Sequence, residues 1–444
     1  MTPTVSDGPS ETDDRAEGAR GSGRSTGEGP APTDPDRGVS RRHLLWGSTA
    51  VGAVAGAGCL GGPLGGGDGN RLAPSVYVFN TGDRTVSVLD PDAMEVVETV
   101  GAGLTASFPS NQYSPGLVTD PDDHLWVNVS DGVAALRAGD LSEAARVETG
   151  AGANWLERTP DGNRVVVSAR EPAHRQFLVD ADPDSGSFGE ALASIDRGEG
   201  TGEDREGPGP CDVTFAPGGD HAFVPDLFGD TLTVLRVDPF EVVAQVDVDP
   251  VVEGVDEARP WMGTAALDGD RLAVEHDEGD GAESIWDVSD PTDPEEVARL
   301  TTADGLGENP LTSEIAPDDR TLFVFTPDTE DVTVVDVREA TVEGRIDLGG
   351  VAYTGTWDPD RRSLFVPVQT SDEVAVIDPD EREVVERIPV GASPYGATAG
   401  GVRPEASMGG RLLADLVAAG VDTGGEMTYC RGECHCGAVE ENRE

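Results

Sequence analysis

The chain has 444 residues, of which 85 are acidic and 31 basic, so its formal net charge at pH 7 is −54. A surface this negative repels phosphate backbones and anionic lipid heads, which excludes nucleic acids as partners. The 58 Gly and 32 Pro residues imply many turns and exclude a mostly helical protein. Every basic residue is Arg, which together with the acidic excess is typical of a protein from an extreme halophile. Most acidic residues are therefore expected to form a solvated surface.

The first 39 residues contain almost no large apolar side chain and are expected to be disordered. Residues 40–59 begin with Ser40-Arg41-Arg42-His43-Leu44-Leu45 and continue as an uncharged Gly/Ala/Val run. This segment resembles a twin-arginine export signal, and the resemblance implies a passenger that folds before export. The uncharged run is short and weakly apolar for a membrane span.

The end of this segment, Gly56-Ala57-Gly58-Cys59, resembles an archaeal lipobox in which Cys59 would carry the lipid. Gly56 departs from the larger aliphatic residue that is usual there, so cleavage after Ala57 by an ordinary signal peptidase stays open. The Gly-rich residues 60–74 would be a tether. These features predict a protein exported to the outer face of the cell membrane, with the lipid anchor as its only membrane contact.

From residue 75 to 403 the sequence repeats at intervals of about 40 to 57 residues, and such a period predicts a propeller or a solenoid. Each unit reads as an alternating run, a Pro-Asp-type turn and further Val-rich runs. Six units are complete, and the seventh is split: residues 77–100 supply three strands, and residues 393–398 supply the missing first strand. This predicts an all-β, seven-bladed β-propeller of four-stranded blades, closed by N- and C-terminal strands and expected to be a monomer.

Two blades carry the clearest repeats. The first contains Val76-Tyr77-Val78-Phe79-Asn80 and Val86-Ser87-Val88-Leu89-Asp90, and the seventh contains Val374-Ala375-Val376-Ile377-Asp378. These repeats resemble the YVTN family of β-propeller repeat proteins. The resemblance implies the fold and says little about chemistry, because propellers host many unrelated functions.

The longest connections between repeats are expected to crowd one face of the ring. They comprise residues 101–113, 181–209, 249–259 and 301–309. Enlarged loops on one rim usually carry the function. The second blade is expected to open with a strand at Pro115.

The residue after each blade-opening Pro, or its equivalent, is expected to line the central channel at this face. Around the ring these positions are Gly116, Trp155, Cys211, Trp261, Leu311, Tyr353 and Tyr395. The four aromatic residues would suit stacking on a flat ligand, a sugar or an inserted partner side chain. The alternative is that these large side chains plug the channel and pack blade to blade.

The ends of the second strands are expected to point toward the same mouth. These positions are Asn80, Asn128, Ser168, Asp226, Glu275, His276 and Thr326. His276 with Glu275 could bind a metal or act as acid and base, or could be one more polar residue of an acidic surface. His276 is also the only reasonable axial ligand if the chain were related to the haem d1 propeller of nitrite reductases. The heavy chain of methylamine dehydrogenase is a second conceivable relative by fold.

Residues 404–444 form a tail after the propeller. The apolar spacing of Leu412, Leu413, Leu416 and Val417 predicts a short helix within residues 405–421. Beyond it lie three thiols and one imidazole, from Cys430, Cys434, His435 and Cys436.

Soft thiolates beside an imidazole favour Zn or Cu, with Cys211 as a candidate further ligand. The alternative is a disulfide, because the exported environment is oxidising and Cys211 with the three tail thiols makes an even number.

No nucleophile elbow, zinc-protease motif or phosphate loop is present, so no catalytic residue is assigned. The sequence favours a cell-surface binding protein whose loop-rich channel face takes a protein or a small ligand. The alternatives are an extracytoplasmic metal-binding or oxidoreductase-type propeller and a surface adhesion protein.

Overall fold

The computed structural model describes residues 72–101, 114–150, 153, 155–200, 205–267 and 269–421. They belong to the second of two compact units, Gly65–Glu444, and the first unit, Met1–Leu64, lies wholly outside them. The predicted export signal with Arg41 and Arg42, the predicted lipidation site Cys59 and the tail beyond residue 421 therefore lie outside the described residues.

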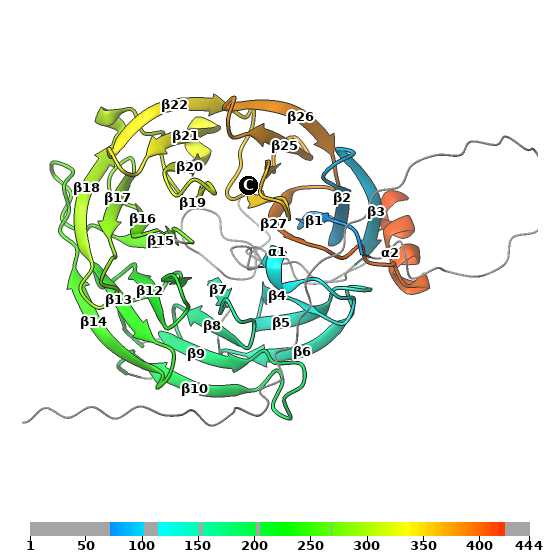
Figure 1. Ribbon diagram of the computed structural model, residues 1–444, viewed down its shortest axis with the longest axis horizontal. Coiled ribbons are helices and arrows are strands. Elements are labelled where there is room, and N and C mark those ends of the chain that lie inside the picture. Colours follow the sequence, from blue (N-terminus) through cyan, green and yellow to red (C-terminus); the bar gives the residue numbers. More distant parts are fainter. Residues whose placement is uncertain are drawn as a thin grey trace, which may run out of the picture. The chain divides into compact units, whose positions relative to one another are not determined.

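Seven antiparallel sheets form a ring of blades (Figure 1), which confirms the predicted seven-bladed β-propeller. The first blade comprises β1 (Ser75–Asn80), β2 (Thr85–Asp90), β3 (Glu95–Gly101) and β27 (Pro394–Gly400). The second comprises β4 (His124–Val129), β5 (Gly132–Arg137) and β6 (Glu143–Glu148), and the third β7 (Trp155–Arg158), β8 (Arg164–Ala169), β9 (Arg175–Asp180) and β10 (Ala191–Asp196). The fourth comprises β11 (Thr214–Phe215), β12 (His221–Asp226), β13 (Thr231–Arg236) and β14 (Glu241–Asp247).

The remaining three blades repeat the same order of strands. The fifth comprises β15 (Pro260–Ala265), β16 (Arg271–His276), β17 (Ala282–Asp287) and β18 (Glu295–Thr301), and the sixth β19 (Thr312–Ile315), β20 (Thr321–Thr326), β21 (Asp331–Asp336) and β22 (Thr341–Asp347). The seventh comprises β23 (Thr356–Trp357), β24 (Leu364–Val368), β25 (Glu373–Asp378) and β26 (Glu383–Pro389). The helical elements are α1 (Ser114–Leu117), η3 (Thr302–Asp304), η4 (Pro327–Thr329) and α2 (Met408–Ala418).

The ring closes as predicted, because β27 pairs antiparallel with β1 in one sheet. Val76 lies opposite Ala399, and Val78 lies opposite Ala397. The Tyr77 hydroxyl donates a hydrogen bond to the Val402 carbonyl just beyond β27. The two ends of the repeat region thus hold each other in a single blade.

The predicted opening strand of the second blade at Pro115 is wrong. Residues Ser114–Leu117 form the short helix α1 instead, and three strands of this blade are described. Proline is favoured in the first turn of a helix, which suits Ser-Pro-Gly-Leu to a helical turn rather than a strand. The Gly401 N–H donates to the Val118 carbonyl, so the chain after α1 is held against the end of β27.

The predicted long connection over residues 181–209 is also wrong in extent, since it contains strand β10. Four residues of β10, from Ala193 to Asp196, pair with β9, and Ala191 pairs with it beyond a bulge. The side chains of β10 are exposed or half-buried throughout, so its sequence lacks the buried apolar run that marks the inner strands.

The core lies between the blades, where side chains of successive strand residues alternate between the two neighbouring blades. Leu272 and Val274 of β16 belong to an apolar cluster with Phe223 of the fourth blade. Ala273, between them, belongs to a cluster with Leu322 of the sixth blade. By the same alternation, the side chain of Glu275 is on the face of β16 toward the sixth blade.

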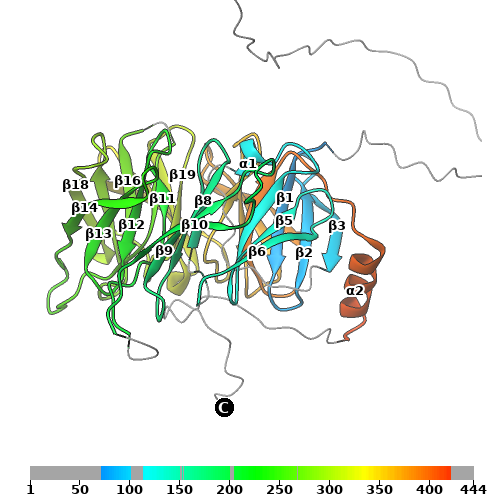
Figure 2. The same cartoon turned by 90° about the horizontal axis from the view of Figure 1, so that it is seen from below.

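The predicted C-terminal helix is present as α2, which lies alongside β3 at the outer edge of the first blade (Figure 2). Ser407 caps its start by accepting a hydrogen bond from the Gly410 N–H. Gly101 allows the close approach, because a Cβ there would lie 2.5 Å from the Leu413 side chain. Among the described residues, no helix is long and apolar enough to cross a membrane.

Candidate functional site

The aromatic residues predicted at the channel mouth come together in one buried cluster. Trp155, Trp261 and Tyr395 share it with Cys211 and Leu311. Tyr353 packs against them with its ring stacked on that of Tyr395, at 4.8 Å between centroids and 22° between planes. Six of the seven aligned positions therefore meet around the channel, and the seventh, Gly116, lies exposed in α1.

Polar contacts hold this cluster in place. The Trp261 indole N–H donates to the Pro310 carbonyl at 3.0 Å. The sulfur of the buried Cys211 lies 4.0 Å from the Met262 sulfur and 3.9 Å from Arg170 Nη1. Trp155 and Trp261 are 7% and 0% exposed, so packing occupies most of their surface.

A cavity of about 20 Å³ adjoins the aromatic cluster at Trp155 and Met262, which belong to both. That volume holds about one water molecule. Five consecutive blades, from the third to the seventh, supply its lining. The lining residues are Trp155, Glu157, Asp212, Thr214, Met262, Gly263, Thr264, Thr312, Ser313, Glu314 and Thr354. We call this space the channel cavity.

Asp212 is the most deeply placed carboxyl of this lining, at 1% exposed. Its two oxygens accept hydrogen bonds from the Val213 N–H at 2.6 Å and the Gly263 N–H at 2.7 Å. Burial raises the pKa of Asp212 to about 7, although both N–H donors oppose that shift. This carboxyl therefore changes its charge near neutral pH.

Glu275 and Glu283 form a second buried acidic pair, directly opposite each other on β16 and β17. Both side chains are 0% exposed, and none of their four carboxylate oxygens has a hydrogen-bond partner among the described residues. Burial raises the pKa of Glu275 to about 8, with the charges of Asp212 and Glu314 adding to it and the nearby Ser313 hydroxyl opposing it. Burial and the charge of Glu275 hold the pKa of Glu283 well above its usual range.

Asp226, predicted at the rim, is instead fully buried at the end of β12. Arg197 binds both of its carboxylate oxygens, at 2.7 and 2.9 Å. The hydroxyls of Thr231 and Thr233 donate to the same carboxylate at 2.8 and 2.6 Å. Burial raises the pKa of Asp226, and the Arg197 charge opposes this. The carboxylate ties the connection after β10 to the fourth blade.

Asn80 has the same place in the first blade. It is 1% exposed, and its amide donates to the hydroxyls of Thr85 and Ser87, each at 2.9 Å. Asn80 and Asp226 thus bond to the third strand of their own blade, whereas the Ser168 hydroxyl donates to the Asp212 carbonyl of the next blade at 2.8 Å.

His276 is 0% exposed and bonds through both ring nitrogens. Nδ1 lies 3.0 Å from the Ala258 carbonyl, and Nε2 lies 2.8 Å from the Ser284 hydroxyl. Because a carbonyl only accepts, the proton is assigned to Nδ1. Burial lowers the pKa of His276 well below its usual value, so the ring is neutral and Nε2 accepts from Ser284. His276 fastens the connection before β15 to the fifth blade.

Of the predicted metal ligands, only Cys211 lies within the described residues. In the described part of the chain, no three His, Cys, Asp or Glu residues are grouped so that they could hold a metal ion. The predicted ligands Cys430, Cys434, His435 and Cys436 lie outside the described residues. Cys211 lies inside the aromatic cluster.

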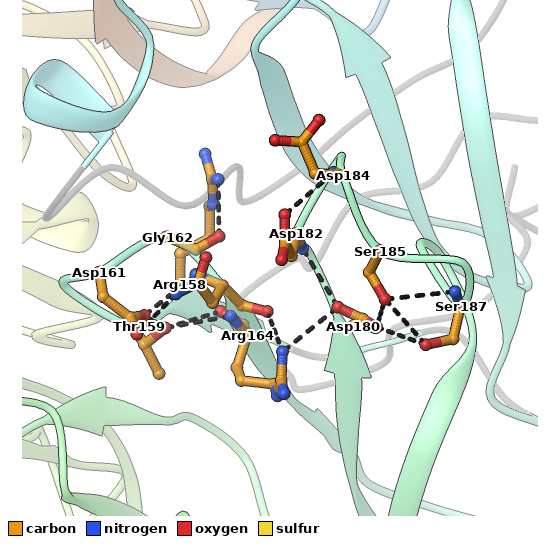
Figure 3. Close-up of polar contacts among 11 residues, drawn as sticks. Arg158, Thr159, Asp161, Gly162, Arg164, Asp180, Asp182, Asp184, Ser185 and Ser187 are labelled. Atoms are coloured by element: carbon orange, nitrogen blue, oxygen red, sulfur yellow. Dashed lines mark hydrogen bonds and ion pairs between the residues drawn. The ribbon is translucent and has the colours of Figure 1, made fainter.

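A second hollow lies between the third and fourth blades, with a volume of about 620 Å³ and a mixed lining that includes Arg164, Leu192 and Phe240. Figure 3 shows the polar contacts beside it. Asp180 accepts hydrogen bonds from the hydroxyls of Ser185 and Ser187 at 2.6 and 2.5 Å. Asp180 also pairs with Arg164 at 3.2 Å. This acidic turn is therefore occupied in holding the β9–β10 connection.

The sequence analysis missed Glu157, Asp212, Glu283, Ser313 and Glu314. Single acids carry little information in a chain with 85 of them, but alignment of the blades does carry a signal. Glu283 is the second residue of its strand, where other blades have Val86, Leu232, Val332 and Val374. Glu275 is the fifth residue of β16, where Phe79 and Phe325 stand in β1 and β20. A buried acid at a blade position where several other blades have an apolar residue is therefore a signal, although the third blade has Gln176 at the Glu283 position and Ser168 at the Glu275 position.

No protein-family model matches the chain, and no curated protein matches it. Solved structures do. The periplasmic gluconolactonase of Pseudomonas aeruginosa is 18% identical, with a TM-score of 0.56 over 73% of this chain and 98% of that one. Hydrazine synthase of Kuenenia stuttgartiensis is 15% identical, with a TM-score of 0.53 over 72% and 99%. A functionally unknown protein from Desulfotomaculum acetoxidans is 13% identical, with a TM-score of 0.57 over 75% and 100%. At these identities the likeness shows the fold, a seven-bladed β-propeller, and no activity.

Proposed function

We propose that this chain is a ligand-binding propeller whose site is the channel cavity. The observation that carries the proposal is that five consecutive blades supply polar side chains to one small space beside an indole. Carboxyls from Glu157, Asp212 and Glu314 and hydroxyls from four Thr residues and Ser313 line it, next to Trp155. Convergent polar groups in a concave, partly apolar setting are typical of ligand sites.

The setting of this function is also a proposal. The Arg41-Arg42 segment and the sequence around Cys59 support an exported lipoprotein on the outer face of the membrane, in a salt-rich environment. The repeats support membership of the YVTN type. In that setting the cavity takes a small molecule or a partner side chain from outside the cell.

The test is a thermal-shift screen of the full chain in molar NaCl against small polar molecules. A ligand at one hundred times its Kd stabilises the folded state by about 2.7 kcal/mol, which raises the melting temperature by several degrees. We expect Trp155→Phe to reduce the shift and Leu192→Ala, in the hollow between the third and fourth blades, to leave it unchanged. The reverse pattern would place the site elsewhere.

A second candidate, a metal-handling or oxidoreductase-type protein, is favoured by the sequence of the tail, with Cys430, Cys434, His435 and Cys436 within seven residues. Elemental analysis of protein purified without chelator, beside thiol counting, tests it. About one Zn or Cu per chain that is lost in Cys434→Ser would support this candidate. Metal-free protein with oxidised thiols would reject it.

A further inference from the structure

The channel cavity is acidic, and none of the described residues in its lining is basic. Glu157, Asp212 and Glu314 contribute carboxyls, and no Arg is among the residues that line the space. The chain has no Lys at all. A ligand that brings positive charge would therefore meet acceptors on several sides and no competing cation within the lining.

Buried acceptors without partners lie next to the same space. Ser313 lines the cavity and is 4% exposed, and its hydroxyl makes no hydrogen bond of regular geometry among the described residues, although it lies close enough to Glu275 to oppose the rise in that carboxyl's pKa. Glu275, cross-strand neighbour of the lining residue Met262, leaves both carboxylate oxygens unpartnered. Buried polar groups are nearly always bonded, so each exception needs an explanation. A bound ligand that donates hydrogen bonds to Ser313 and Glu275 would explain both exceptions.

The basic group whose charge acts on Glu283 does not fill that need. Arg299 of β18 donates to Glu278 at 2.9 Å and to both oxygens of Glu296 at 2.8 Å. It reaches Glu283 only through space, where its charge opposes the rise in that carboxyl's pKa. The acidic groups that face Glu275 are Asp212, Glu283 and Glu314.

We propose that the channel cavity binds a primary ammonium group, held by the Asp212 carboxylate and the neighbouring Ser313 and Glu314 side chains beside the Trp155 indole. This inference rests on the proposed function and names the ligand class. An ammonium head has about the size of a water molecule, which matches the volume of the cavity. Its three N–H donors suit a ring of carboxylate and hydroxyl oxygens, and an indole face attracts cations.

The ammonium has two sources with the same chemistry, a free small amine or a lysine side chain of another protein. This chain supplies no lysine of its own. Methylammonium chloride serves as the probe for the first source, and Nα-acetyl-lysine amide for the second. Tetramethylammonium, which carries the same charge without N–H donors and is too large for the cavity, is the control.

Binding should also release protons. Without a cation, Asp212 and Glu275 titrate near pH 7 and 8. A cation favours their ionised forms, so the affinity should rise with pH across this range, by up to about tenfold per pH unit for each proton released. The other charged groups near Asp212 and Glu275 are Glu283, Glu314 and Arg299.

The experiment measures thermal shifts of the full chain with each probe at constant ionic strength, at pH 6 and pH 8. We expect methylammonium to raise the melting temperature more at pH 8, and tetramethylammonium to have no effect. Asp212→Asn should weaken methylammonium binding at least tenfold, while Glu95→Gln, at an exposed carboxyl on β3, should not change it. If Asp212→Asn fails to fold, proton release by the unmutated chain in weak buffer provides the second measurement.

Three results separate the hypotheses. A response to the lysine amide as well as to methylammonium supports the ammonium class and identifies a protein partner as a source. A neutral polyol that binds with loss in Trp155→Phe, without any response to ammonium probes, upholds the ligand-binding function and overturns this inference. Equal shifts with methylammonium and tetramethylammonium, or no proton release on binding, also overturn it.

Discussion

Replacing Glu275 with Gln removes one of two buried carboxyls that face each other across β16 and β17. The pKa of Glu275 is about 8 in the folded chain, so the carboxyl keeps its proton up to that pH, whereas in the unfolded chain it loses the proton near its ordinary pKa of 4.5. The folded state therefore binds more protons than the unfolded state between these two values. The contribution of Glu275 to the free energy of unfolding is therefore fully present below about pH 4.5 and is lost as the pH rises toward 8.

The size of this effect follows from the shift. Glu275 is fully buried, so solvent does not screen its charge. The rise in its pKa corresponds to at most about 5 kcal/mol of unfolding free energy between pH 4.5 and 8. The slope is about 1.4 kcal/mol per pH unit for one proton. Because Glu275 also raises the pKa of Glu283, its removal should relax that carboxyl as well, and the pair titrates together.

Urea unfolding at fixed molar NaCl, from pH 5 to 8, measures the slope. We expect the free energy of unfolding of the unmutated chain to fall as the pH rises. For Glu275→Gln this fall should be smaller by about 1.4 kcal/mol per pH unit, the slope for one proton. Glu95→Gln, with an exposed carboxyl, should follow the unmutated chain. Identical slopes in Glu275→Gln and the unmutated chain would refute the assignment of a buried, protonated pair.

Three further outcomes follow. Asp226→Asn should lower the free energy of unfolding by about 3 kcal/mol in urea titrations, because Arg197 is left buried without its partner, whereas Asp92→Asn at an exposed ion pair should change it by less than about 1 kcal/mol. Below pH 6.5 the unfolded His276 gains a proton that the buried ring refuses, which offsets about one proton of the opposite slope set by the buried carboxyls; His276→Gln should therefore make the free energy of unfolding fall more steeply between pH 5 and 6.5, and an unchanged slope would contradict the neutral ring. Lowering NaCl from molar to tens of millimolar should reduce the melting temperature, because the net charge of −54 is then unscreened, and a constant melting temperature would disprove that role of the charge.

The repeat pattern was enough to predict the seven blades and the closing strand, and it aligned the aromatic residues that meet in one buried cluster. Trp155, Trp261 and Tyr395 could be aligned because each follows a blade-opening Pro or its equivalent, and strand position fixes location in a ring. Pro115 obeyed the same pattern yet starts a helical turn. Here the local preference of Ser-Pro-Gly for a helical turn outweighed the repeat pattern, and no strand at this position pairs with β4 in the structure.

The polar site could be predicted only in part. Asn80, Asp226 and His276 were correctly placed at strand ends, but whether such a side chain faces the channel or its own third strand depends on side-chain geometry. Each of the three side chains hydrogen-bonds to a hydroxyl on the third strand of its blade. The partners are Thr85, Thr231 and Ser284. Those partners lie five to eight residues along the chain, so a search for hydroxyls opposite each strand end would have indicated the buried alternative.

Because β1 pairs with β27, the first blade can form completely only after the chain has been synthesised as far as β27. More than 300 residues separate Tyr77 from its partner Val402, so a chain released early would leave the β1 edge without a neighbour. An unpaired strand edge is a template for aggregation. For the folded export proposed above, a fragment that lacks β27 would be a poor passenger, because β27 is the last of the described strands and closes the ring.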